Sequence, residues 1–101
     1  MTKADVIAQI SEKTGIEKTD VQKTLETFFT VVKDSLADGE NLYVRGFGSF
    51  INKKRARKVA RNISLKSTII IDEHFVPSFK PAKVFIEQVK ASDKLKLELQ
   101  N

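Results

Sequence analysis

The most constraining feature of the sequence is a long cationic segment without any acidic residue. Between Glu40 and Asp72 lie eight lysines and arginines, so this window has a charge of +8; because the whole chain has +5, the remainder has −3. Its densest part, residues 53–66, reads KKRARKVARNISLK. An extended strand points successive side chains to opposite faces, so this segment has cations on both faces and neither face suits a core. It must leave the folded body, and its charge favours a polyanion over a solvated surface, where acidic residues would be interspersed.

The segments on either side of the cationic run predict β-strands. Residues 41–52, NLYVRGFGSFIN, are rich in aromatic and β-branched side chains and are broken by glycines, which indicates two short strands. Residues 67–76, STIIIDEHFV, predict a further strand, which Pro77 is expected to end. A hairpin that leaves the sheet joins these runs, with its tip near residues 62–66. An isolated two-stranded ribbon is only marginally stable in water, so we expect this arm to be mobile until it is bound.

Two helices are predicted before the strands, and one after them. Thr2 and Asp5 have the spacing of a capping box, and Gly15 provides a stop. The second helix should run from about residue 18 to 36, before Gly39. Pro81 suits the first turn of the last helix, which is expected to end near residue 90.

The apolar face of the second helix is wider than one short helix can cover. It spans roughly 100° of the helix surface, and Val31 widens it to about 160°. The residues of this face are Val21, Leu25, Phe28, Phe29, Val32 and Leu36. Without the arm the body has only about 75 residues, which bury a modest fraction of their surface. We therefore expect a two-fold dimer with a pooled core, which also places two arms side by side.

Three short motifs carry a resemblance to a known family. GFGSF at residues 46–50, RNI at 61–63 and VPSFKPAK at 76–83 occur in an order that resembles the bacterial histone-like HU and integration host factor proteins, over residues 1 to about 90. The resemblance implies an α+β fold and an intertwined dimer: two N-terminal helices, a three-stranded antiparallel sheet with a long β-hairpin arm, and a short C-terminal helix. In this fold the helical hairpin takes residues 1–39, the sheet 40–76 with its arm at about 52–74, and the last helix 81–90.

The same resemblance implies an architectural, nucleoid-associated protein of the bacterial cytoplasm. Its paired arms would clamp duplex DNA through the minor groove and bend it, largely without sequence specificity. Bent, nicked or cruciform sites would be preferred. We expect a homodimer, with a heterodimer as the alternative, and a site-specific subunit like those of integration host factor is the nearest competing function.

The expected DNA-binding residues follow from the charge of the arm and from the resemblance. By resemblance, Arg55, Lys58, Arg61 and Asn62 make arm contacts, whereas Lys3, Lys80 and Lys83 meet phosphates beside the body. The charge of the arm adds Lys53, Lys54, Arg57 and Lys66. By resemblance the dimer core would include Phe28, Phe29, Val32, Phe47, Phe50 and Phe79.

The tip departs from the family pattern. Ile63 stands where the family has an intercalating proline, and Ala60 and Lys66 stand where glycines are usual. Minor-groove binders use exposed apolar residues as wedges between base steps, so Ile63 is expected to serve as the wedge. In the alternative, Ile63 packs across the hairpin on Val59 or Leu65.

Other functions have weaker support in the sequence. His74 is the only histidine, and it reads as a strand-end residue. Asp72 and Glu73 are adjacent and would face opposite ways on a strand, and the chain has no cysteine. We therefore expect no enzymatic activity, no metal and no cofactor, and we expect no membrane span, because no run of about 18 apolar residues occurs. An RNA-binding protein of ribosomal type, whose basic hairpin threads into folded RNA, remains as a second class.

The resemblance ends near residue 90, and residues 91–101 form a C-terminal extension. This segment, ASDKLKLELQN, alternates leucines with charged residues, which is a strand-like period. We expect either an added strand, packing on the body, or a frayed terminus.

Overall fold

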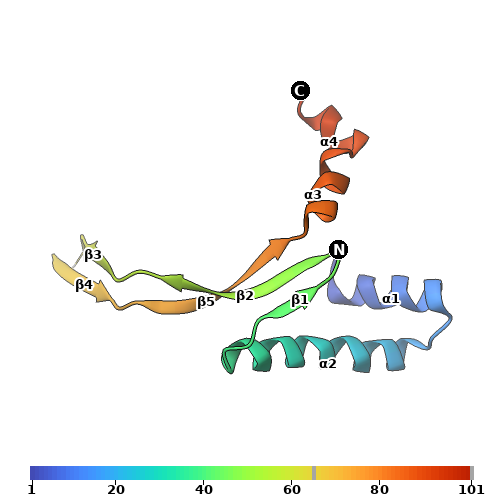
Figure 1. Ribbon diagram of the computed structural model, residues 1–101, viewed down its shortest axis with the longest axis horizontal. Coiled ribbons are helices and arrows are strands. Elements are labelled where there is room, and N and C mark those ends of the chain that lie inside the picture. Colours follow the sequence, from blue (N-terminus) through green and yellow to red (C-terminus); the bar gives the residue numbers. More distant parts are fainter. Residues whose placement is uncertain (65, 101) are drawn as a thin grey trace.

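The computed structural model describes residues 1–64 and 66–100 and has a mixed α+β fold (Figure 1). Leu65 and Asn101, which belong to the predicted tip and extension, lie outside these residues. The elements are α1 (Lys3–Thr14), α2 (Lys18–Ala37), β1 (Leu42–Val44), β2 (Gly48–Arg55), β3 (Lys58–Asn62), β4 (Ser67–Ile71), β5 (His74–Pro81), α3 (Lys83–Lys90) and α4 (Asp93–Glu98). The radius of gyration is 19.4 Å, against about 13 Å for a compact chain of this length. The difference reflects the long arm that projects from the body.

The helical hairpin forms as its end signals predict. The Thr2 amide donates to the Asp5 carboxylate at 2.8 Å, and the Asp5 amide donates to the Thr2 hydroxyl at 3.4 Å, so the capping box is confirmed. Gly15 ends α1 with a φ of 75°, which glycine adopts without steric cost. Among the described residues, only Ile7 of α1 and Val21 of α2 are buried apolar side chains. A single copy therefore has a very small core.

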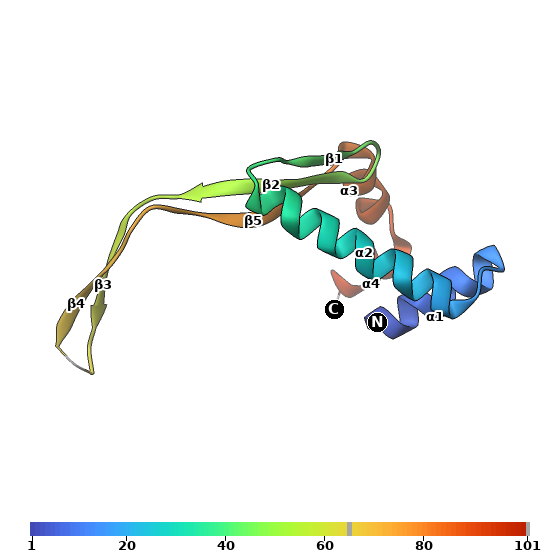
Figure 2. The same cartoon turned by 90° about the horizontal axis from the view of Figure 1, so that it is seen from below.

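The strands form two antiparallel sheets that follow one another along the same hairpin. The first has the order β1-β2-β5, with β2 paired to β5 from Gly48 opposite Pro81 to Arg55 opposite His74. The second contains β3 and β4 alone, and Figure 2 shows that it bends away from the first sheet. The three-stranded sheet with a projecting hairpin is confirmed, although β2 has eight residues and is not a short strand.

Both prolines differ from their predicted roles. β5 continues through Pro77, which lies opposite Asn52, because β5 is an edge strand and edge strands tolerate a residue without an amide hydrogen. Pro81 is the last residue of β5, and α3 begins only at Lys83, with Ala82 as its N-cap. The Ala82 amide instead donates to the Phe47 carbonyl at 2.9 Å, which extends the strand geometry to this point.

Four aromatic rings attach α3 to the sheet. Phe79 lies 5.1 Å from both Phe47 and Phe50 between ring centroids, and Phe47 stacks on Phe85 of α3 at 5.4 Å. Offset and tilted rings at these separations attract one another beyond the area they bury. The GFGSF motif thus supplies two of the rings that position the C-terminal helix.

The C-terminal extension is helical, so the predicted strand is wrong. Ser92 caps α4, and its hydroxyl accepts from the Leu95 amide at 3.4 Å, while Asp93 lies in the first turn. A negative charge at this position stabilises the helix, because it interacts favourably with the positive end of the helix dipole. Leucine, lysine and glutamate are also good helix formers, and no strand edge pairs with this segment.

Candidate nucleic-acid interface

The arm is a two-stranded ribbon with cations on both faces. Lys58 lies opposite Ile71, and Arg61 lies opposite Thr68. The two cations are three positions apart on β3, so their side chains point to opposite faces of the ribbon. Directly opposed residues share a face, so one face carries the pair Val59 and Ile70 beside Arg61. All of these side chains are exposed. The prediction that neither face of this segment is a core face is therefore confirmed.

The tip presents Ile63 to solvent. Its side chain is 86% exposed, and it follows Asn62, the last residue of β3. The Asn62 side-chain oxygen accepts from the Ser64 amide at 3.1 Å, a local bond that fixes the direction of the turn. An apolar side chain with this exposure does not pack across the hairpin on Val59. The alternative contact with Leu65 lies outside the described residues.

Lys66 shows the physical cost of the altered tip. Its φ is 50°, the only positive φ among the described non-glycine residues. A side chain in this region costs roughly 1–2 kcal/mol, which a glycine would not incur. Lys66 is therefore a strained residue that also adds a cation near the tip.

The root of the arm contains the acidic residues closest to the cationic run. Lys54 Nζ lies 3.3 Å from the Glu73 carboxylate, and His74 Nδ1 donates to the Asp72 carbonyl at 2.9 Å. Asp72 and Glu73 connect β4 to β5 and are not strand residues, contrary to the geometry assumed from sequence. His74 begins β5, as predicted for a strand-end residue. Lys53 and Arg55 lie on the same strand as Lys54, and both are exposed.

Lys3 is separated from the arm and already has an acidic partner. Its Nζ lies 3.0 Å from Glu26 Oε1, across 23 residues of sequence. Hydrogen bonds from Lys3 and from Gln22 lower the pKa of Glu26 below its usual value, so this carboxylate is charged at neutral pH. The charge of Glu26 therefore opposes the approach of a phosphate to Lys3.

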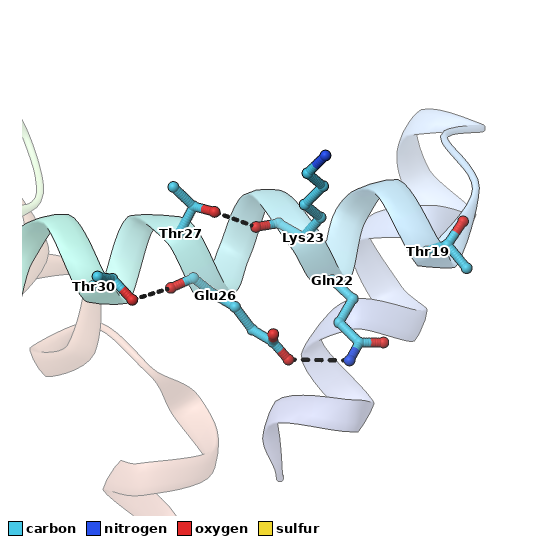
Figure 3. Close-up of a pocket in the computed structure, with 6 residues that line it drawn as sticks. All are labelled: Thr19, Gln22, Lys23, Glu26, Thr27 and Thr30. Atoms are coloured by element: carbon cyan, nitrogen blue, oxygen red, sulfur yellow. Dashed lines mark hydrogen bonds between the residues drawn. The ribbon is translucent and has the colours of Figure 1, made fainter.

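A shallow hollow lies along this side of α2, and three of its polar side chains are engaged in hydrogen bonds within the helix (Figure 3). Gln22 donates to Glu26 at 3.0 Å, and the Thr27 and Thr30 hydroxyls donate to backbone carbonyls one turn earlier, at 2.7 and 3.1 Å. The other lining residues are Thr19 and Lys23. The sequence had not singled out this surface, and its geometry does not change that view.

A second basic surface lies on the body. Lys80 near the end of β5 and Lys83 at the start of α3 line one groove together with Arg45, which precedes the GFG motif. Arg45 lies in the acid-free window but is not among the predicted DNA-binding residues. The sequence signal that could have found it is its place between two predicted strands, opposite the VPSFKPAK motif.

The described residues limit other kinds of site. They contain no group of three histidine, aspartate or glutamate side chains arranged to hold a metal ion. Within the same part of the chain, no helix combines the length and apolar character needed to cross a membrane.

Comparison with known proteins connects this geometry to a family. DNA-binding protein HU of Thermotoga maritima is 39% identical over 90 residues, covering 89% of this chain and all of that protein. Integration host factor subunit beta of Psychromonas ingrahamii is 37% identical over 94 residues, covering 92% and 99%. Anabaena HU in a cocrystal with DNA superposes with a TM-score of 0.85 at 25% identity, covering 91% of this chain and 100% of that one. The family model described as bacterial DNA-binding protein matches residues 1–90, so this chain belongs to the bacterial DNA-binding protein family.

Proposed function

We propose that this chain is an architectural DNA-binding protein of the bacterial nucleoid, which clamps duplex DNA between two basic arms and bends it. The observation that carries the proposal is the exposed ribbon of β3 and β4, with cations on both faces and Ile63 at its tip. The family match and the likeness to Anabaena HU in its cocrystal with DNA support the same partner. The cytoplasm is the compartment in which such a protein would meet the nucleoid.

The clamp requires two copies, and the uncovered apolar surface of one copy supports a dimer. Phe28, Phe29 and Val31 of α2 are 41%, 43% and 56% exposed. A groove between the end of α2 and the sheet is lined by apolar side chains, including Val32 and Phe50, two of the predicted dimer-core residues. A two-fold partner would cover both surfaces, and we propose the homodimer as the basic unit. Pairing with a related chain, as in a heterodimer, would use the same surfaces.

Binding would combine electrostatic attraction with insertion into the base stack. Each phosphate neutralised by a lysine or arginine releases condensed counterions, and two arms would neutralise about ten phosphates. A ribbon fits a groove of the duplex, and arginine is favoured where the minor groove is narrow. Ile63 would then separate two base steps, at a cost of a few kcal/mol that the extra contacts of bent DNA offset.

The Ile63→Ala variant is expected to bend DNA less than the native chain, because alanine is too short to hold two base pairs apart. The end-to-end distance of a doubly labelled nicked duplex, measured by FRET at saturating protein, should increase toward its protein-free value. The arm is exposed, so the fold and the salt dependence of binding should change little. Val59→Ala, which removes an exposed apolar side chain from the same ribbon below the tip, is the matched control. Equal bending by native and Ile63→Ala proteins would reject the wedge.

The Glu26→Gln variant is expected to bind DNA about two- to fivefold more tightly, since it releases Lys3 and removes a carboxylate from its vicinity. Titration of a long duplex that can reach the body, at low salt, measures this gain. Glu12→Gln removes the same charge from exposed helix α1 without freeing Lys3, so it should have a smaller effect. If the two variants bind alike, Lys3 has no special role in phosphate contact.

Duplex preference separates this function from RNA binding. Phe47, Phe50 and Phe79 contact one another, and Phe47 and Phe79 also contact Phe85, so these rings do not form an open row of stacking platforms. In competition at fixed salt, nicked or cruciform DNA should displace the protein from A-form duplex RNA. A clear preference for the RNA would overturn the proposed function.

A further inference from the structure

The C-terminal extension adds an apolar helix that the DNA clamp does not use. Residues 91–100 lie beyond the family match, which ends at residue 90. Leu95, Leu97 and Leu99 in this segment are 43%, 61% and 87% exposed. Leu95 and Leu99 are four residues apart and share one face of the turn. So much exposed leucine on so short a segment indicates a surface that another molecule covers.

The end of α3 continues this apolar surface. Ile86 and Val89 of α3 are also exposed. Phe85 of the same helix instead packs on the aromatic cluster of the sheet. The Ser92 amide donates to the Val89 carbonyl at 3.1 Å, so α4 follows α3 through a tight connection and stays beside it. We call the exposed residues Ile86, Val89, Leu95 and Leu99 the C-terminal apolar surface. Leu97 does not belong to it, because it lies roughly 200° around α4 from Leu95.

The charge of the extension argues against a polyanion or an anionic lipid surface as its partner. Lys94 and Lys96 are balanced by Asp93 and Glu98, so α4 and its flanks have no net charge. Neutral segments gain little from the electrostatic attraction that drives binding to DNA or to anionic membranes. The arm, by contrast, has no acidic residue from Lys53 to Ile71.

The same chain carries a second uncovered apolar surface that cannot reach the first. Figure 1 shows α3 and α4 on one side of β2 and β5, and α1 and α2 on the other. The exposed Phe28, Phe29 and Val31 therefore belong to a different part of the molecule from the C-terminal apolar surface. In an isologous dimer both copies use the same surface, so that residue i of one copy contacts residue j of the other and j contacts i. Two separate patches of one chain can therefore cover each other across the two-fold axis. Two such surfaces on one chain satisfy each other only between two copies.

We propose that residues 91–100 extend the interface between two copies of this chain, with the C-terminal apolar surface of each packed on helices α1 and α2 of the second copy. This inference rests on the dimer of the proposed function and adds to it a role for the segment outside the family match. The extension would act as a strap that slows dissociation of the clamp. The DNA-contacting arms remain at the opposite end of the sheet.

Dimer dissociation of the full-length Leu95→Ser, Leu99→Ser double variant tests the inference. Each copy loses two buried leucines and two copies form the interface, so the dimer dissociation constant should rise at least about tenfold. Sedimentation equilibrium over a dilution series measures this constant. The control variant Lys94→Gln, Lys96→Gln alters the polar positions of the same helix and should dissociate like the native chain. Secondary structure by circular dichroism is expected to be the same in all three proteins at concentrations where they are dimeric.

Isotope-filtered NMR on a mixture of labelled and unlabelled native protein can detect the contact between the two copies directly. Nuclear Overhauser effects between the methyl groups of Leu95 and Leu99 in one copy and aromatic protons of the second copy are expected. A native chain that is dimeric, with a double variant that dissociates no more readily, would refute the strap and leave the clamp intact. A native chain that is monomeric at micromolar concentration and on DNA would refute the dimer itself.

Discussion

The Gly48→Ala variant is expected to be the least stable single substitution in the body of this protein. A methyl group at residue 48 would lie 2.6 Å from the Lys80 carbonyl oxygen and 2.7 Å from two atoms of the Phe79 ring. The carbonyl belongs to the backbone of β5, which is paired with β2 along its whole length, and the ring is held by Phe47 and Phe50. Neither neighbour can move without breaking the sheet or the aromatic cluster. Overpacking of this kind costs roughly 1–3 kcal/mol and sometimes more.

Thermal unfolding followed by circular dichroism measures the effect, and Gly46→Ala is the matched control. Gly46 has a φ of 80°, so alanine there is strained by roughly 1–2 kcal/mol, but its methyl group would meet nothing within 4 Å. A chain with so small a core has little stability to lose, so a midpoint drop several degrees larger is expected for Gly48→Ala. If Gly46→Ala lowered the unfolding midpoint more than Gly48→Ala, close packing would not be the reason for a glycine at residue 48.

The helices and the arm could be predicted because their signals are local. The capping box of Thr2 and Asp5, the stop at Gly15 and the change to β-branched residues after residue 41 each act over a few residues. The arm was predictable for a different reason: cations on both faces of a strand exclude burial whatever the rest of the chain does. That physical exclusion needs no knowledge of the partner.

The errors arose where a local preference depends on a distant neighbour. Pro77 is compatible with a strand only at a sheet edge, and its edge position depends on the order β1-β2-β5. The leucines of the extension alternate as in a strand, but the described residues of this segment pair with no strand, and the Ser92 cap stabilises the helix. The alternation of the leucines alone therefore cannot show whether the extension is a strand or a helix; that depends on the tertiary fold.

The candidate site shows the same limit for charged groups. The sequence identified Lys3 and Lys54 as cations, but it gave no indication that Glu26 and Glu73 would lie beside them. Ion pairs of this kind join residues 23 and 19 positions apart and depend on how the elements pack. They matter for function because a carboxylate beside a lysine opposes the approach of a phosphate.

Replacing Arg57, Lys58 and Arg61 together by alanine is expected to abolish most of the DNA affinity at physiological salt. These side chains are exposed on the arm, and Arg61 belongs to β3 next to the tip. Three cations in each of two copies correspond to as many as six phosphate contacts. The slope of log K against log salt concentration is negative, and each lost contact reduces its magnitude by about 0.9, so the magnitude should fall by up to about 5. Affinity should fall by roughly 100-fold or more at 0.1 M salt.

A control of equal charge decides whether position or net charge is responsible. Replacing Lys13, Lys18 and Lys23 by alanine removes the same three charges from the exposed surfaces of α1 and α2, away from the arm. Long-range attraction alone would weaken both variants alike and mainly at low salt, because screening acts within about 10 Å at 0.1 M. Direct contact predicts a reduced slope for the arm variant and a native slope for the helix variant. Equal slopes in the two variants would mean that the arms do not hold the phosphates, and the clamp would have to be abandoned.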